Sequence, residues 1–259
     1  MNFDPGFNIT PVYQPPEFRY GADCFGPEVE NRKLDDIRGS LRDPGCNGPA
    51  IVYSIVMDVG KLQHRTLLNQ MHLLYGAVMY AAGKLGDEPI RSQGHIHKVS
   101  PLCHRSTPEV YEIWEGEGII YMQEEGGDDP GRCFAVSAKA GEVVIVPPGW
   151  THATISANPS LPLIFGAWCD REYGFEYDKV RAHKGIAWFP LFDSNRELGW
   201  EPNPHYAKSE LVCKSPEQHP ELGIVPEETI YSTFERNPDT FLYVPYPQRV
   251  EDVWEKFIP

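Results

Sequence analysis

Basic residues are scarce in this chain of 259 residues: 23 lysines and arginines stand against 37 aspartates and glutamates, for a formal charge of −14. Nucleic acids and anionic membranes are bound through clusters of basic side chains, and the sequence contains no such cluster. We therefore expect neither a nucleic acid nor a membrane as a partner.

Two further absences concern cysteine and long apolar runs. The six cysteines show no Cys-x-x-Cys spacing of the kind that binds metals, and no signal peptide or long apolar span precedes them. Thiols without these features are reduced by default, so we expect a cytoplasmic protein with free cysteines. The sequence also contains no internal repeat and no low-complexity tract.

Short β-type runs are separated by dense glycine and proline, of which the chain holds 23 and 25. Frequent turn residues between short runs favour a mainly β fold, an antiparallel barrel or jelly roll with a few peripheral helices, over alternating strand–helix units. We expect a single domain, with an N-terminal arm over residues 1–50, a barrel over 51–190 and an extension over 191–259 that packs on the barrel.

The expected elements follow from the spacing of apolar residues. Helical spacing in the arm predicts one amphipathic helix over Glu28 to Leu41. The pattern predicts strands over Ile51 to Val59, Met71 to Ala82, Gly118 to Met122, Val143 to Val146, Leu163 to Trp168, Ile230 to Phe234 and Thr240 to Val244, and a closing helix over Gln248 to Phe257.

Two stretches carry the chemistry of this chain. Gly94-His95-Ile96-His97 places two imidazoles two residues apart, and alternate residues of a strand face the same side. Glu109 opens the next apolar run, and His152 follows a rigid Pro147-Pro148-Gly149 corner. Together they offer three imidazoles and one carboxylate, a set that can hold one divalent metal ion.

This donor set narrows the choice of metal. Neutral imidazoles with one carboxylate suit Fe(II), Mn(II), Ni(II), Co(II) or Zn(II), whereas Ca²⁺ and Mg²⁺ prefer sites built from oxygen. The donor set does not by itself identify the metal; we predict one divalent ion per chain and favour Fe(II) or Mn(II).

These stretches resemble the paired motifs of the cupin superfamily, and most closely those of the cupin-type glucose-6-phosphate isomerases of archaea and some bacteria. The resemblance covers roughly Ile51 to Trp188 and rests on Gly94-His95-Ile96-His97, Pro108-Glu109-Val110-Tyr111, Gly116-Glu117-Gly118 and Val146 through His152. It implies a double-stranded β-helix barrel and the metal ligands His95, His97, Glu109 and His152. Exposed strand edges on such a barrel make a homodimer our expectation.

The resemblance implies an aldose–ketose isomerase that interconverts glucose 6-phosphate and fructose 6-phosphate. A metal would polarise the sugar carbonyl and stabilise an enediolate, with Glu109 as the base that moves the proton between C2 and C1. Tyr111 lies on the same strand face, where its hydroxyl could orient Glu109 or a substrate oxygen. A metal-assisted hydride shift, which needs no base, is the alternative route.

The sugar phosphate is the expected small-molecule partner, and its contacts are predicted at Ser92, Gly94, Lys84 and Arg91, with Arg105 and Arg171 as further candidates for the phosphate. Two positions at which the family uses hydroxyls hold Val78 and Cys169 in this chain. A non-catalytic sugar-binding cupin is therefore one alternative function. A metal-dependent dioxygenase is another, because the resemblance to cupins includes oxygen-activating members whose metal is held by three histidines and one glutamate.

Overall fold

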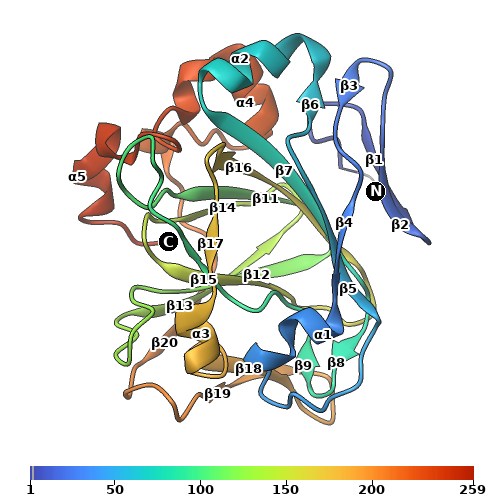
Figure 1. Ribbon diagram of the computed structural model, residues 1–259, viewed down its shortest axis with the longest axis vertical. Coiled ribbons are helices and arrows are strands. Elements are labelled where there is room, and N and C mark those ends of the chain that lie inside the picture. The colour runs from blue at the N-terminus through green and yellow to red at the C-terminus, as the bar shows by residue number, and fades with distance from the viewer. Residues whose placement is uncertain (2) are drawn as a thin grey trace.

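Two β-sheets, in which most strand pairs are antiparallel, form the body of the protein in the computed structural model, which describes Met1 and residues 3–259 (Figure 1). The larger sheet has the strand order β14-β11-β16-β7-β5-β4. Its strands are β14 (Val143–Val146), β11 (Glu109–Glu115), β16 (Leu163–Asp170), β7 (Leu73–Tyr80), β5 (Ile51–Met57) and β4 (Glu30–Lys33).

The smaller sheet has the order β15-β12-β13-β20. It contains β15 (Thr151–Ser156), β12 (Glu117–Gln123), β13 (Cys133–Lys139) and β20 (Leu211–Lys214). Three of these strands pair antiparallel, and β20 from the C-terminal extension pairs parallel with β13. The predicted fold class, a mainly β jelly-roll barrel of the cupin type, is confirmed.

Short hairpins and helices surround the two sheets. The paired short strands are β1 (Ile9–Tyr13) with β2 (Pro16–Tyr20), β3 (Cys24–Phe25) with β6 (Gly60–Lys61), β8 (Lys84–Leu85) with β9 (Glu88–Pro89), β10 (Ile96–His97) with β17 (Phe175–Glu176), and β18 (Trp188–Phe192) with β19 (Leu198–Pro202). The helices are α1 (Leu34–Ile37), α2 (Arg65–Gln70), α3 (Asp178–Ala182), α4 (Ile230–Arg236) and α5 (Glu251–Trp254). Short 3₁₀ turns cover Arg38–Ser40, Leu62–His64, Pro220–Leu222, Pro238–Phe241 and Pro247–Val250. None of the helices that the structure describes is long and apolar enough to span a membrane.

The larger sheet buries both of its faces, which explains why β16 is buried along its whole length. Its inner face packs inside the barrel, where Tyr111 and Phe165 belong to one hydrophobic core. Its outer face, with Trp114 and Trp168, packs in a second core against the arm and the C-terminal extension. Alternation along each strand thus assigns successive residues to different cores.

The N-terminal arm is part of the sheet rather than only a cover over it. Strand β4 hydrogen-bonds along β5, with Arg32 opposite Tyr53 and Glu30 opposite Ile55. The predicted helix over residues 28–41 was wrong over most of its length, because only Leu34–Ile37 is α-helical and a 3₁₀ turn follows. Leu34, Ile37 and Leu41 are buried as the pattern indicated. The residues before Leu34 form strand β4 instead of helix, because they pair with β5.

The C-terminal extension forms helix where strands were predicted. Ile230–Arg236 is α4, and a 3₁₀ turn ends at Phe241 within the second predicted strand. Thr229 caps α4, since its side-chain oxygen accepts a hydrogen bond from the Ser232 N–H, and this cap outweighs the β-type composition of the segment. The closing helix is shorter than predicted, with only Glu251–Trp254 in α5.

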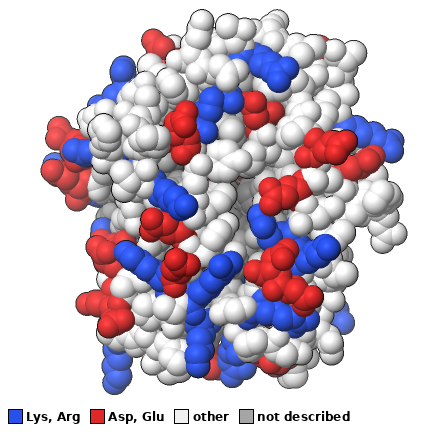
Figure 2. Space-filling view, viewed as in Figure 1, with Lys and Arg blue, Asp and Glu red and all other residues white. Residues whose placement is uncertain are grey.

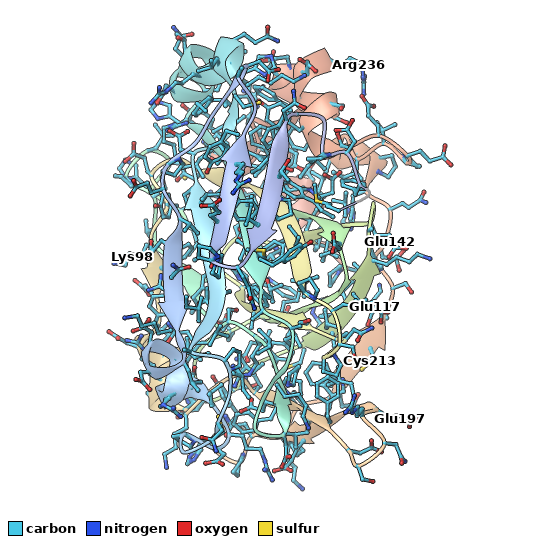
Figure 3. All side chains as sticks on the ribbon, turned by 90° about the vertical axis from the view of Figure 1, so that its right-hand side faces the viewer. Lys98, Glu117, Glu142, Glu197, Cys213 and Arg236 are labelled. Carbon is cyan, nitrogen blue, oxygen red and sulfur yellow. The ribbon has the colours of Figure 1, made fainter. Side chains whose placement is uncertain are left out.

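The helices of the extension cover the outer face of the larger sheet, as the red ribbons of Figure 1 show. The Trp168 indole lies 5.7 Å from the Tyr231 ring and 4.8 Å from the Phe234 ring, and it donates to the Ile230 carbonyl. The blue strands of the arm lie in front of the barrel in Figure 3. In that view Arg236 and Glu197 mark opposite ends of the molecule.

Candidate metal centre

The four predicted ligands come from both sides of the barrel. His97 ends the short strand β10, Glu109 begins β11 in the larger sheet, and His152 lies on β15 in the smaller sheet. His95 pairs with His152 through two backbone hydrogen bonds of 3.0 and 2.9 Å. The His-x-His segment is therefore fastened to β15, which aligns two of the imidazoles.

The donor atoms of His95, His97, Glu109 and His152 all lie within 4.8 Å of one another. Zinc–nitrogen bonds are about 2.1 Å long, so two ligands on opposite sides of one ion lie roughly 4.2 Å apart. The observed spread is close to this value. The four side chains converge as the sequence predicted, and together they could hold one metal ion.

The hydrogen bonds behind the imidazoles favour a cation at this point. His97 Nδ1 lies 2.9 Å from the Thr107 carbonyl and His152 Nδ1 lies 3.1 Å from the Trp150 carbonyl, so both Nδ1 atoms donate. In a neutral imidazole the other nitrogen is then an acceptor. Both Nε2 atoms face the Glu109 carboxylate, at 3.1 and 3.3 Å. Acceptors that face each other this closely need a proton or a metal ion between them.

His95 supplies a second observation that fits a metal. Its Nε2 is buried and has no hydrogen-bond partner among the described residues. Burial, together with the nearby imidazoles of His152 and His97, holds the pKa of His95 well below its usual value, so the ring is neutral. A neutral imidazole with a free nitrogen is the form that binds a metal.

Glu109 is held as a carboxylate. Burial alone would raise its pKa, but the positive charge of a proton shared with the facing His152 and His97 rings outweighs burial and holds the pKa well below the usual range. The Tyr111 hydroxyl donates to the same oxygen, Oε2, at 2.7 Å. Cys169 donates its thiol hydrogen to Oε1 at 3.2 Å. Both oxygens of the carboxylate are thus oriented by neighbouring groups.

A cavity opens from this cluster along the inner face of the larger sheet. His95, Glu109 and Tyr111 line its inner end. Further lining comes from Val78, Tyr80, Phe165, Thr154 and the aromatic residues Tyr173, Phe175 and Tyr177 around β17. The Phe175 ring lies 4.4 Å from the His95 ring and covers it. The cluster therefore borders a space in which a small molecule could reach the metal ligands.

The predicted substrate contacts fall in different places. Ser92 lines the cavity, and its hydroxyl accepts a hydrogen bond from the Thr154 N–H. Gly94 has a φ of +90°, and a Cβ there would lie 2.7 Å from Ile186, so the turn before His95 requires glycine. Lys84 lies on β8, outside the described lining of the cavity.

Arg91 is placed as a structural residue rather than as a cavity side chain. Its side chain is fully buried, and its guanidinium donates to Glu88 and to the Ser40 and Ser92 carbonyls. Arg105 pairs with Glu251 on the surface, and Arg171 pairs with Asp58 at 2.7 Å. These three arginines have carboxylate partners within the chain.

The sequence reasoning missed the cavity residues that the arm supplies. Glu30 and Arg32 on β4 and Tyr53 on β5 line the cavity. The segment Glu30–Lys33 is entirely polar, so no hydrophobic alternation marks it as a strand.

Figure 2 shows the face of the molecule that is turned toward the viewer in Figure 1. Acidic and basic side chains are intermixed over this face, with no patch of one sign.

Comparison with known proteins gives the family. The family model described as glucose-6-phosphate isomerase (GPI) matches residues 46–207, which include all four ligands. The glucose-6-phosphate isomerase of Pyrococcus furiosus is 29% identical over 136 residues, or 52% of this chain and 66% of that protein. The enzyme of the same name from Sinorhizobium medicae is 30% identical over 130 residues, or 50% of this chain and 55% of that protein.

These matches span between about half and two thirds of the length of the two relatives. Among solved structures, recombinant oxalate oxidase in complex with glycolate has a TM-score of 0.37 at 14% identity, with 53% of this chain and 60% of that chain covered. The family-model match covers more than half of the chain and contains both motifs. By its sequence, and with its four candidate ligands inside one β-barrel, the chain belongs to the glucose-6-phosphate isomerase family in its cupin form.

Proposed function

We propose that the protein is a metal-dependent aldose–ketose isomerase that interconverts glucose 6-phosphate and fructose 6-phosphate. The observation that carries this proposal is the convergence of His95, His97, Glu109 and His152 at the inner end of a cavity. The family match supplies the substrate class. Fe(II) or Mn(II) is the proposed ion, and the predicted homodimer and cytoplasmic location stay predictions.

The residues of the chain then have distinct roles. When bound, a divalent ion would polarise the sugar carbonyl and stabilise the negative charge that develops on the C1 and C2 oxygens. Glu109 would move a proton between C2 and C1, and Tyr111, whose hydroxyl donates to Oε2 at 2.7 Å, would orient it. Phe175 and Phe165 line the cavity with apolar surface.

The proton route and the hydride route differ in the fate of the hydrogen at C2. If Glu109 removes the C2 proton, substrate deuterated at C2 will lose label to water during turnover. Complete retention of deuterium at C1 of the product would exclude Glu109 as the base and favour the hydride shift.

The test of the function is metal content and turnover on the same preparations. We expect purified wild type to contain about one divalent ion per chain and to isomerise both sugar phosphates in a coupled assay. His95→Ala removes the ligand whose Nε2 has no other partner among the described residues, and it should lose metal and turnover together. His205→Ala, at an exposed histidine, is the matched control.

Two outcomes would contradict the proposal. One is His95→Ala that keeps turnover without metal. The other is metal-reconstituted wild type that converts neither sugar phosphate. Binding without conversion would favour the sugar-binding alternative, and oxygen consumption with a candidate diol would favour a dioxygenase.

A further inference from the structure

Arg32 brings a positive charge into the cavity from β4, the edge strand of the larger sheet. The candidate ligand Glu109 lies on β11, near the opposite edge of that sheet. On β4, Arg32 lies opposite Tyr53, which lies opposite Tyr80 on β7, and all three side chains line the cavity. Among the described lining residues, Arg32 is the one lysine or arginine. It also lies outside residues 46–207, the segment that matches the family model.

The guanidinium of Arg32 is only partly used. Its Nη2 donates to Glu30 Oε1 at 2.7 Å, whereas its Nε is buried and has no hydrogen-bond partner among the described residues. A buried donor without a partner costs free energy, and such donors in native structures are normally satisfied by a protein group, an ordered water or a bound ligand. The free Nε–H therefore marks a place for an acceptor.

The partner that Arg32 does have is weakly held. The Glu30 side chain is 65% exposed, and ion pairs this exposed to water contribute little. The Arg32–Glu30 pair therefore contributes less to the stability of the fold than the fully buried pair of Arg91 and Glu88. An incoming anion can replace Glu30 as the partner of the guanidinium.

Tyr177 connects Arg32 with the metal ligands in space. Its ring centroid lies 6.0 Å from that of His95, and the Arg181 guanidinium lies 5.0 Å from the Tyr177 ring. Arg32 lies close enough to Tyr177 for its charge to oppose the rise in the Tyr177 pKa that burial causes. Tyr177 is therefore near both Arg32 and the ligand His95, and all three residues line the same cavity.

We infer that Arg32 binds the anionic end of the substrate and makes this site selective for phosphorylated sugars. This inference depends on the proposed function for the identity of the sugar. An arginine fork with a free Nε–H can donate two parallel hydrogen bonds to a phosphate or carboxylate. The sugar then lies with its carbonyl carbons at His95 and Glu109 and its charged group at β4.

The experiment compares three sugars on the metal-loaded protein by calorimetry and by turnover. Glucose 6-phosphate carries the phosphate, glucose carries no charge, and glucuronate carries a carboxylate at the same carbon. The variants are Arg32→Gln, Arg32→Lys and Glu30→Gln. Arg19→Gln, which changes an exposed arginine that forms an ion pair with Glu17, is the matched control.

We expect Arg32→Gln to weaken binding of glucose 6-phosphate by roughly tenfold to a hundredfold, the usual effect of losing hydrogen bonds from a charged group. Its affinity for glucose should stay at the wild-type value. Arg32→Lys keeps the charge but not the fork, so its loss should be smaller. Glu30→Gln removes the competing carboxylate and should tighten binding of the phosphate ester about twofold to fivefold.

Other results would overturn the inference. Equal losses for glucose and glucose 6-phosphate in Arg32→Gln would mean that Arg32 only supports the fold of the cavity, and an unchanged phosphate affinity would exclude it from binding. Tight, Arg32-dependent binding of glucose 6-phosphate without turnover would support the inference while it contradicts the isomerase. Arg32-dependent binding of glucuronate in preference to glucose 6-phosphate would support an anion site and reject the sugar phosphate as the ligand.

Discussion

Glu109 is the residue on which the candidate site depends. Its Oε2 lies within hydrogen-bonding distance of His97, His152 and the Tyr111 hydroxyl, and its Oε1 accepts from Cys169. A carboxylate with this many neighbours has one orientation, so it can present itself to an ion without losing rotamer entropy. Loss of a group that orients a ligand in this way commonly lowers metal affinity or activity about tenfold to a hundredfold.

Tyr111→Phe tests this orientation at the scale of one hydroxyl. The ring stays in the barrel core, so the variant should fold and keep its metal. We expect turnover to fall about tenfold to a hundredfold, because Oε2 loses a donor that fixes its direction. Steady-state kinetics with metal analysis on the same sample gives the measurement, with Tyr246→Phe in the C-terminal extension as the control.

A Tyr111→Phe variant with normal kcat would show that the hydroxyl is only a packing feature. A variant that lost its metal would show that Tyr111 acts on ion binding instead. The sequence placed Tyr111 on the face of Glu109 from alternation alone, but only the structure shows the hydrogen bond of 2.7 Å.

At the scale of elements, one buried carboxyl joins the barrel to the C-terminal extension. Glu112 on β11 accepts from the Ile230 N–H at the start of α4 and from the Trp114 indole. Burial raises the pKa of Glu112 to about 7, and the two hydrogen bonds only partly oppose that rise. The attachment of α4 therefore includes a group that titrates near neutral pH.

The sign of the pH effect follows from linkage. Between the ordinary pKa of 4.5 and the folded value of about 7, Glu112 is ionised in the unfolded chain but protonated in the folded protein. The folded state thus binds more protons, and its stability falls as pH rises through this range. At about 1.4 kcal/mol for each pH unit, the loss is roughly 3 kcal/mol.

Glu112→Gln removes this titration, so its free energy of unfolding should depend less on pH. We expect the stability of wild type relative to Glu112→Gln to fall by up to about 3 kcal/mol between pH 4.5 and 7. Urea unfolding at several pH values measures the difference, with the exposed Glu117→Gln as the control. Parallel pH profiles for wild type and Glu112→Gln would refute the assignment.

The sequence predicted the strands of the barrel more accurately than the elements of the C-terminal extension. The strands from Ile51 to Trp168 were found because each is a compact apolar run between turn residues, and the structure confirms those that were predicted there within a few residues. The extension was misread, because the residues of α4 have β-type side chains and become helical through the Thr229 cap and the packing of Tyr231 and Phe234 on Trp168.

At the scale of the whole molecule, the candidate ligands connect the two sheets. Glu109 belongs to the larger sheet and His152 to the smaller one. A metal bound by both would therefore join the sheets at the centre of the barrel. An ion that binds only the folded protein adds free energy to folding in proportion to the logarithm of its concentration.

Removal of the metal should therefore lower the thermal stability of the whole barrel. At a free metal concentration 100 times the dissociation constant, the expected contribution is about 2.7 kcal/mol. Calorimetry with and without a chelator measures the shift in Tm, and His95→Ala, which should bind no ion tightly, should show no shift. Equal chelator effects on the two proteins would contradict the site.

The sequence alone determined the β-rich fold class, the family and the four candidate ligands, because these depend on local spacing: two-residue alternation, glycine and proline turns, and two short motifs with fixed positions for the histidines and the glutamate. Only the tertiary structure decided what surrounds the ligands. Arg91 is buried against Glu88, whereas Arg32 reaches the cavity from a polar segment that pairs with β5. Such assignments depend on which distant strand pairs with which, and contacts between residues far apart in the chain leave no local pattern in the sequence.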